Sequence, residues 1–184
     1  MIHRNTVVRS LHDIGLAAWF GGSLMGAVGL NGAAAKAKSP AERLRLSSIG
    51  WARWAPVQLA ALAAHGIGGL GLIKGNKMRL IGQEESRTNT TIKTGVTLVA
   101  LATTAYSGIL GKRISDHQGE PTEGVTEPAE ESSDALASAQ RQQRIFQWLT
   151  PALTLVLIVL AAQQGEQQRP IKGLFQTTLK SLRK

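Results

Sequence analysis

Histidine is the residue type through which this sequence could most readily do chemistry, and one of its four histidines lies deep in an uncharged stretch. His65 follows Trp54 by 11 residues, which is about 16 Å along a helix axis and close to the middle of a bilayer. Two histidines at equal depth on facing helices could ligate haem. His12 stands at the edge of another uncharged stretch, and His3 and His117 lie outside. The sequence therefore predicts no such pair and no cofactor.

An ionisable residue at this depth is a functional candidate by default. For His65 the simplest expectation is a neutral imidazole that is hydrogen-bonded to a neighbouring helix. Asn31, Gln58 or a threonine of residues 94–111 is the expected partner. The uncharged stretches contain no acidic residue, which argues against a proton pump or an ion-coupled carrier.

Other chemistry is scarce. The chain has no cysteine, which excludes a disulfide framework, a thiolate nucleophile and a cysteine metal site. It carries no phosphate loop, zinc motif or serine elbow, and "GIGGLG" at 66–71 lacks the strand–turn–helix setting of a dinucleotide fingerprint. The sequence therefore predicts no enzymatic activity.

Four uncharged stretches must position these residues. They cover residues 14–35, 54–73, 94–111 and 145–164 and are 22, 20, 18 and 20 residues long. Crossing the hydrocarbon core takes about 20 mainly apolar residues. We therefore expect an all-α integral membrane protein, a four-helix bundle formed by residues 1–164. Two alternatives stay open: a soluble all-α bundle, and a cleaved signal peptide in the first stretch, although that stretch exceeds the roughly 7–15 apolar residues of a signal core.

Small residues recur at helical spacing in the first three stretches. In lipid, helices associate by close backbone contact, which small residues permit. We expect these stripes to make helices one to three a tight core, with Gly22 and Gly26 forming a GxxxG match. The predicted helix-packing residues are Gly15, Gly22, Gly26, Gly29, Gly68, Gly71, Thr97 and Thr104.

The fourth stretch differs, because "LTLVLIVLAA" is bulky and aliphatic on every face. Such a helix cannot bring backbones close together. We expect it at the periphery, facing either lipid or another protein. Leu153, Leu157 and Leu160 are the predicted partner contacts.

Lysine and arginine counts predict the topology. With four spans, the N-terminus, the loop 74–93 and the tail 165–184 share one side with 12 basic residues, against 9 on the other side. The positive-inside rule then places both termini in the cytoplasm. The tail resembles a basic amphipathic helix on the membrane surface, with a frayed, solvated tail as the alternative. Its predicted surface residues are Lys172, Phe175, Lys180 and Arg183.

The two exterior loops differ in kind. Ser39, Pro40 and Glu42 have the order of a capped helix start, so we expect a short helix that leads into the second span. Trp51 and Trp54 are expected in the aromatic belt at the membrane edge, at the level of Phe146 and Trp148.

The other exterior loop, residues 116–134, has seven acidic residues and no lysine or arginine. It is poor in hydrophobic residues and contains prolines and glycines, which predicts disorder. A solvated linker and a flexible partner for basic surfaces are its two open roles.

The stretches "LHDIGLAAWFGGSLMGAVGLN" and "WAPVQLAALAAHGIGG" resemble small four-helix membrane proteins of actinobacteria. Within that group the chain is most similar to accessory subunits found with MCE-type lipid importers of the mycobacterial envelope. The pattern of His12, Ala17, Trp19, Gly21 and Gly22 also resembles copper-resistance-D-like membrane families, but the chain lacks the methionine and histidine richness of copper handling.

The resemblance implies a non-catalytic accessory or assembly subunit of a larger membrane complex, with membrane lipids as neighbours. The net charge of +9 is assigned to anionic lipid rather than to nucleic acid. The alternative function is a small transporter or ligand-binding protein, for a lipid or a metal, that uses the polar interior around His65.

Overall fold

The structure is a computed structural model in which residues 6–75 and 84–167 are described. Helix α1 (Thr6–Met25) continues through a π-helical turn, η1 (Gly26–Leu30), into α2 (Asn31–Ala34). Three further helices follow: α3 (Pro40–Gly75), α5 (Glu84–Asp116) and α6 (Asp134–Gln167). The predicted all-α fold is confirmed, and four helical segments are long and apolar enough to cross a membrane. The chain is thus a multi-pass membrane protein.

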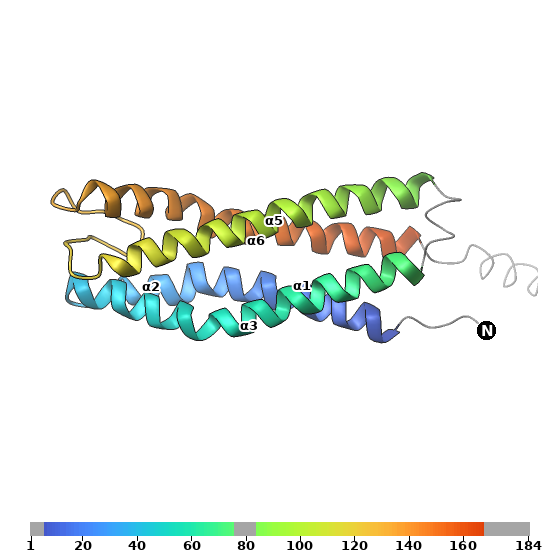
Figure 1. Ribbon diagram of the computed structural model, residues 1–184, viewed down its shortest axis with the longest axis horizontal. Coiled ribbons are helices and arrows are strands. Elements are labelled where there is room, and N and C mark those ends of the chain that lie inside the picture. Colours follow the sequence, from blue (N-terminus) through green and yellow to red (C-terminus); the bar gives the residue numbers. More distant parts are fainter. Residues whose placement is uncertain (1–5, 76–83, 168–184) are drawn as a thin grey trace, which may run out of the picture.

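The helices form two antiparallel hairpins that lie side by side (Figure 1). One hairpin pairs α1 with α3, and the other pairs α5 with α6. Helix α1 also packs on α6, whereas α3 and α5 contact each other only sparingly. The turn 35–39 and the loop 117–133 lie together at one end of the bundle, called here the loop end; α3 finishes and α5 begins at the opposite end (Figure 1).

Helix α3 begins where the sequence predicts. The backbone N–H of Glu42 donates a hydrogen bond to Ser39 Oγ, at 3.2 Å, as a capping serine requires. The prediction of a short separate helix is wrong, however, because α3 runs without a break from Pro40 to Gly75. It passes through Pro56, a residue that membrane helices tolerate.

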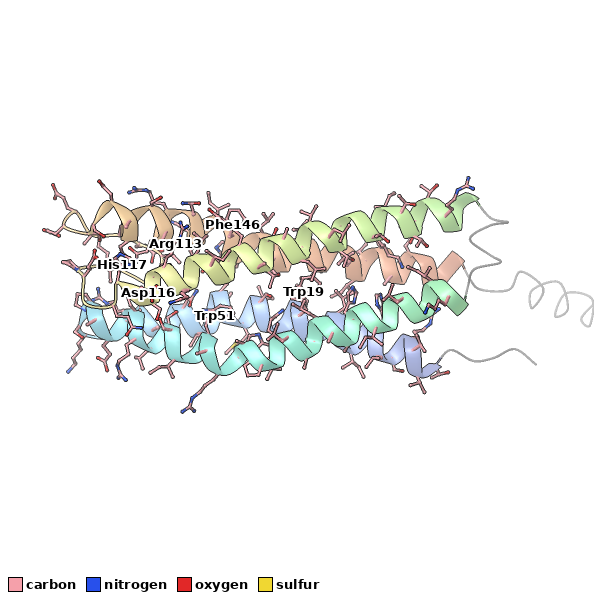
Figure 2. The ribbon with its side chains drawn as sticks, in the orientation of Figure 1. Trp19, Trp51, Arg113, Asp116, His117 and Phe146 are labelled. Atoms are coloured by element: carbon pink, nitrogen blue, oxygen red, sulfur yellow. The ribbon has the colours of Figure 1, made fainter. Side chains whose placement is uncertain are left out.

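Two apolar clusters hold the helices together. Near the loop end, Leu44 of α3 packs with residues of α5 and α6, among them Leu110 and Leu136. In the middle, Leu16, Trp19, Ala100 and Leu157 form a cluster from α1, α5 and α6. Figure 2 shows Trp19 inside the middle of the bundle, and its side chain is fully buried.

The peripheral position expected for the fourth helix is therefore wrong. Leu157 is only 2% exposed, and Leu153 packs against the same central cluster. Leu160 is partly buried as well. Ala100 is small, so a bulky leucine from α6 has room in the space beside it. The outward face of α6 includes other residues, among them Trp148, Leu155, Val156 and Val159.

The glycine prediction holds for the first hairpin only. A Cβ atom added at Gly15, Gly22, Gly26, Gly68 or Gly71 would collide with the facing helix. At Gly29 it would meet only Met25 of its own helical segment. In α5 the expected close packing is absent, because a Cβ at Gly108 or Gly111 would have nothing within 4 Å. Thr97 of this helix lines a cavity instead. Thr104 also borders a cavity, but its hydroxyl oxygen accepts a hydrogen bond from Trp19 Nε1 of α1 at 3.1 Å, so it does contact a neighbouring helix.

The disorder expected for residues 116–134 is wrong, since the structure describes a folded loop there. Thr122, Val125 and Thr126 are buried. Gln140 of α6 donates from Nε2 to Thr122 Oγ1 at 2.7 Å and to the Val125 carbonyl at 3.0 Å. Arg43 of α3 donates to two further loop carbonyls. Long polar side chains from two helices thus take the place of a hydrophobic core.

The surface helix predicted for the tail lies outside the described residues, which end at Gln167. The four tail residues concerned are Lys172, Phe175, Lys180 and Arg183.

Candidate functional site

The two histidines that the sequence separates are in direct contact. The rings of His12 and His65 stack with centroids 4.0 Å apart and planes inclined by 21°. His12 Nδ1 lies 2.9 Å from the His65 carbonyl oxygen, and His65 Nδ1 lies 3.2 Å from the His12 carbonyl oxygen. The partners expected for His65, namely Asn31, Gln58 or a threonine, are therefore wrong, and so is the unequal depth of the two histidines.

Glycines allow this contact, and they do so symmetrically. Each histidine is followed three residues later by a glycine, in "HDIG" and "HGIG". A Cβ at Gly15 would lie 2.5 Å from His65 N, and one at Gly68 would lie 2.5 Å from His12 N. In two antiparallel helices each glycine therefore receives the backbone of the opposite histidine. The repeated H-x-I-G is the sequence signal that could have revealed the pair.

The hydrogen bonds place a proton on Nδ1 of both rings, because a carbonyl oxygen only accepts. Trp19 lies edge-on to His65 with ring centroids 5.9 Å apart. Among the described residues no three histidine, aspartate or glutamate side chains gather as a metal site would require.

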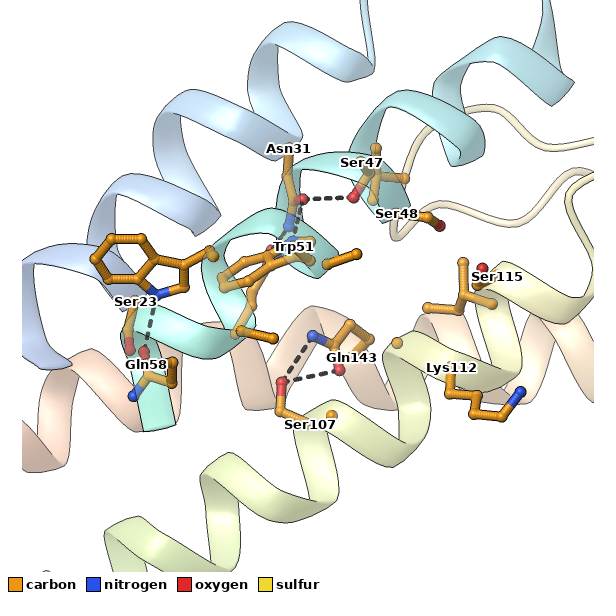
Figure 3. A pocket seen from close by; sticks show the side chains of 18 of the residues that line it. Ser23, Asn31, Ser47, Ser48, Trp51, Gln58, Ser107, Lys112, Ser115 and Gln143 are labelled. Carbon is orange, nitrogen blue, oxygen red and sulfur yellow. Dashed lines mark hydrogen bonds between the residues drawn. The ribbon is translucent and has the colours of Figure 1, made fainter. Parts of the chain in front are cut away.

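A cavity of about 440 Å³ lies between the histidine pair and the loop end. It is called here the polar cavity because most of its lining side chains carry a polar group, although its accessible surface is mainly apolar. All four long helices line it with uncharged hydrogen-bonding side chains, and Figure 3 shows how these converge. The polar lining includes Ser23, Asn31, Ser47, Ser48, Trp51, Trp54, Gln58, Thr104, Ser107, Ser115, Gln143, Gln147 and Thr150. Lys112 stands at the rim, where it is exposed and paired with Asp116 at 2.9 Å.

Asn31 organises one wall of this cavity. Its Oδ1 accepts hydrogen bonds from Ser47 Oγ at 2.9 Å and from Trp51 Nε1 at 3.0 Å, while its Nδ2 donates to Gln147 Oε1 at 3.0 Å. One buried amide thus connects α2, α3 and α6. On the opposite wall, Ser107 of α5 pairs with Gln143 of α6 (Figure 3).

Gln58 is the unsatisfied group of the cavity. Its Oε1 accepts a hydrogen bond from Trp54 Nε1 at 2.9 Å. Its Nε2 is buried and has no hydrogen-bond partner among the described residues. A buried donor without a partner destabilises a protein by about 1–3 kcal/mol. A ligand with a hydrogen-bond acceptor would therefore stabilise the protein by pairing with Gln58 Nε2.

Three of the four residues expected in the aromatic belt do not face outward. Trp51 and Trp54 turn their indoles inward, against Gly26 and Gly22, and line the polar cavity. Phe146 packs on Tyr106 with ring centroids 4.9 Å apart. Only Trp148, half exposed, stands outward as a belt residue would.

A second cavity of about 620 Å³ lies towards the opposite end and includes the histidine pair in its wall. Its lining is mainly apolar, but Arg9, Asp13 and Lys93 stand along it. The central cluster around Trp19 and Leu157 lies between the two cavities along the helices. Sequence reasoning missed both cavities, because they depend on how far α3 and α5 separate.

Comparison with protein-family models, curated proteins and solved structures finds no match for this chain. The function must therefore be argued from the geometry of these cavities.

Proposed function

We propose that this protein binds a small, uncharged, hydrogen-bonding molecule in its polar cavity, as a membrane-embedded receptor or carrier. The observation that carries the proposal is the buried Nε2 of Gln58, which has no partner among the described residues, in a cavity whose walls combine uncharged polar side chains with mainly apolar surface. Its volume of about 440 Å³ falls within the range of small-molecule sites. Of the two functions that the sequence suggests, the ligand-binding one gains this support, at a place other than His65.

The chemistry of the walls selects the ligand class. Hydrogen bonds in a low-dielectric interior strengthen, whereas a buried charge needs a paired opposite charge. Lys112 at the rim is already paired with Asp116. A ligand with a carbonyl, ether or hydroxyl acceptor for Gln58, and an apolar body for Trp51 and Trp54, satisfies these walls.

The test is native mass spectrometry of the protein isolated in mild detergent from its own membrane. We expect a small-molecule adduct that is lost in Gln58→Leu and in Gly108→Phe, whose new side chain enters the cavity from a position with open space. Gly21→Phe is the matched control, because Gly21 also has open space but does not line the cavity. An adduct that survives both cavity variants, or a wild-type protein without adduct, would refute the proposal.

An accessory subunit of a larger membrane complex is a second candidate function, including the lipid-import complex suggested by resemblance. The outward face of α5 favours it, since Gly95, Ala102 and Ala105 are exposed there. Small outward residues let another membrane helix approach closely. Gly95→Leu should then reduce co-purification of a larger complex without lowering the abundance of this chain. Co-purification with no membrane protein at natural expression levels would count against this function.

We also propose that the protein lies in the cytoplasmic membrane with both termini inside, on the basic-residue count given above. The chain has no cysteine, so single cysteines report topology directly. An impermeant thiol reagent should label Glu131→Cys in intact cells, and Ser181→Cys only after permeabilisation. The reverse pattern would invert the topology.

A further inference from the structure

The second cavity combines a charged rim with an apolar interior. Arg9 and Asp13 of α1 and Lys93 of α5 stand along it, and the charges of Arg9 and Asp13 both act on the Lys93 ammonium. Among the described side chains that line the cavity, these two cations and one carboxylate carry a net positive charge. The apolar part of the lining comes from all four long helices and includes Leu16, Leu98, Leu101, Leu157, Ile158 and Ala161.

The charged and apolar parts occupy different depths. Lys93 and Leu101 line the cavity on the same helix, and eight residues of α-helix span about 12 Å. Arg9 and Lys93 lie near the ends of the segments that could cross the membrane, whereas Leu16 and Leu157 belong to the central cluster. Charged side chains at such ends reside at the level of the lipid headgroups.

We propose that this cavity is a binding site for a membrane lipid with an anionic headgroup. The phosphate of the lipid lies between Arg9 and Lys93, and the first part of one acyl chain follows the apolar wall towards Leu16 and Leu157. A free anion would gain the same cations but would leave the apolar wall without a partner. This site is separate from the polar cavity and does not depend on its ligand.

Charge complementarity also argues against the chain's own C-terminal segment as the occupant. The residues after Gln167 include Lys172, Lys180 and Arg183 and no acidic side chain. That segment would bring further positive charge to a positive rim. A lipid phosphate brings the opposite charge together with the apolar chain that the wall requires.

The experiment titrates the full-length protein in a neutral detergent with phosphatidylglycerol, phosphatidylcholine or inorganic phosphate, and counts bound molecules by native mass spectrometry. We expect phosphatidylglycerol to bind at least about tenfold more tightly than phosphatidylcholine, since each basic residue near a lipid surface contributes about a fivefold preference. Inorganic phosphate should neither bind at comparable concentrations nor displace the lipid.

Variants locate the site. Arg9→Gln and Lys93→Gln should each weaken phosphatidylglycerol binding about fivefold, while Lys112→Gln, an exposed cation on the same helix as Lys93 but at the loop end, should leave it unchanged. Ala161→Phe fills the apolar part and should weaken binding with both rim cations intact. Gln58→Leu, which tests the polar cavity, should have no effect here.

Three outcomes would overturn the proposal. Equal affinity for the two lipids would show that the site does not recognise an anionic headgroup. Unchanged binding in both Arg9→Gln and Lys93→Gln would show that the lipid binds elsewhere. Displacement by inorganic phosphate would make the site one for a free anion. The two rim substitutions lie outside both apolar clusters, so the result stands even if Ala161→Phe fails to fold.

Discussion

Both hairpins contain a helix with a stripe of small residues, but different kinds of contact hold the two helices of each hairpin together. Between α1 and α3, glycines receive the backbone of the opposite helix, as Gly15 does for His65 and Gly68 does for His12. Between α5 and α6, large side chains and polar pairs carry the contact, with Leu110 against Leu136 and Ser107 bonded to Gln143. Helix α5 also contains a stripe of small residues, but its glycines make no close helix contact. Ala100 and Thr104 of this stripe contact other helices through the central cluster and through a hydrogen bond from Trp19.

The difference shows what a small-residue stripe does. Such a stripe permits two helices to approach closely, but they do so only where the facing helix has a complementary surface. In α1 and α3 the two stripes face one another and place a histidine opposite each glycine. In α5, Gly95 and Gly108 face open space. The position of a glycine on the helix, rather than its residue type alone, decides whether it allows close helix packing.

The largest effect is expected from a side chain at the closest backbone contact. Gly68→Leu would drive a side chain into the His12 backbone, which is rigid and cannot give way. Overpacking typically destabilises by about 1–3 kcal/mol, and more where backbone must move. We expect most of the folded protein to be lost, measured as monodisperse yield in size-exclusion chromatography.

The control for this prediction stands two residues away. Gly66→Leu points into open space on the same helix and should retain near wild-type yield. Equal losses for the two variants would mean that leucine harms this segment for reasons other than the α1–α3 contact.

A large-to-small substitution should have the next largest effect, in the second hairpin. Leu136 is fully buried, and Leu136→Ala is expected to destabilise the protein by about 2–5 kcal/mol through lost contacts and a residual cavity. Val159→Ala, on the outward face of α6 with 59% exposure, is the control and should change little. Thermal unfolding in detergent, followed by tryptophan fluorescence, compares the two. A larger loss from the outward valine would contradict the core position of Leu136.

A smaller effect is expected where the two hairpins are joined by a buried amide. Asn31→Leu removes the acceptor of Ser47 and Trp51 and the donor to Gln147. Polar contacts between membrane helices are worth about 0.6 kcal/mol each on average, so a loss of about 1–2 kcal/mol is expected. Asn31→Asp keeps the acceptor but buries a charge beside Gln147 Oε1 with no cation among its contacts, so it should lose at least as much. An unchanged midpoint for Asn31→Leu would show that the amide does not join the hairpins.

Much of the fold could be predicted from sequence, because avoidance of charge over some 20 residues has few explanations other than a membrane span. The cap at Ser39 follows equally from local chemistry. The edges of the uncharged stretches do not indicate the histidine pair, and the repeated H-x-I-G is the one sequence signal for it. Helix α1 begins at Thr6, well before its uncharged stretch, and the glycine contacts set its register against α3.

The cavities escaped prediction for a related reason. A tryptophan near a span edge suggests the lipid interface, but Trp51 finds the Asn31 acceptor inside the bundle. Likewise, the polar composition of residues 116–134 suggests disorder, yet Gln140 satisfies the buried loop carbonyls. Both outcomes depend on single long-range partners, which local patterns do not encode.

The smallest effect concerns the loop that closes the second hairpin, and it depends on pH. Hydrogen bonds from the Ser133 hydroxyl and backbone N–H lower the pKa of Glu120 below its ordinary value of 4.5, and His117 adds a minor contribution. The backbone bond from Ser133 N to Glu120 Oε2 is 2.9 Å long and joins the loop to the start of α6. Since the pKa is depressed in the folded state, this stabilisation is present above about pH 4.5 and is lost as the pH falls through the folded-state pKa.

Hydrogen exchange at the Ser133 amide should therefore accelerate on acidification from pH 6 to pH 3, after correction for the intrinsic rate. In Glu120→Gln the exchange should be faster at pH 6 and should lose this pH dependence, because no carboxylate remains to accept the bond. Glu130→Gln, an exposed acid in the same loop, should behave as wild type. The amides of Leu59 and Ala60 in α3, which lie six and five residues from His65, are the reference in the first hairpin and should not respond. A pH response of equal size in both hairpins would mean that acid acts on the whole bundle rather than on the bond between Glu120 and Ser133.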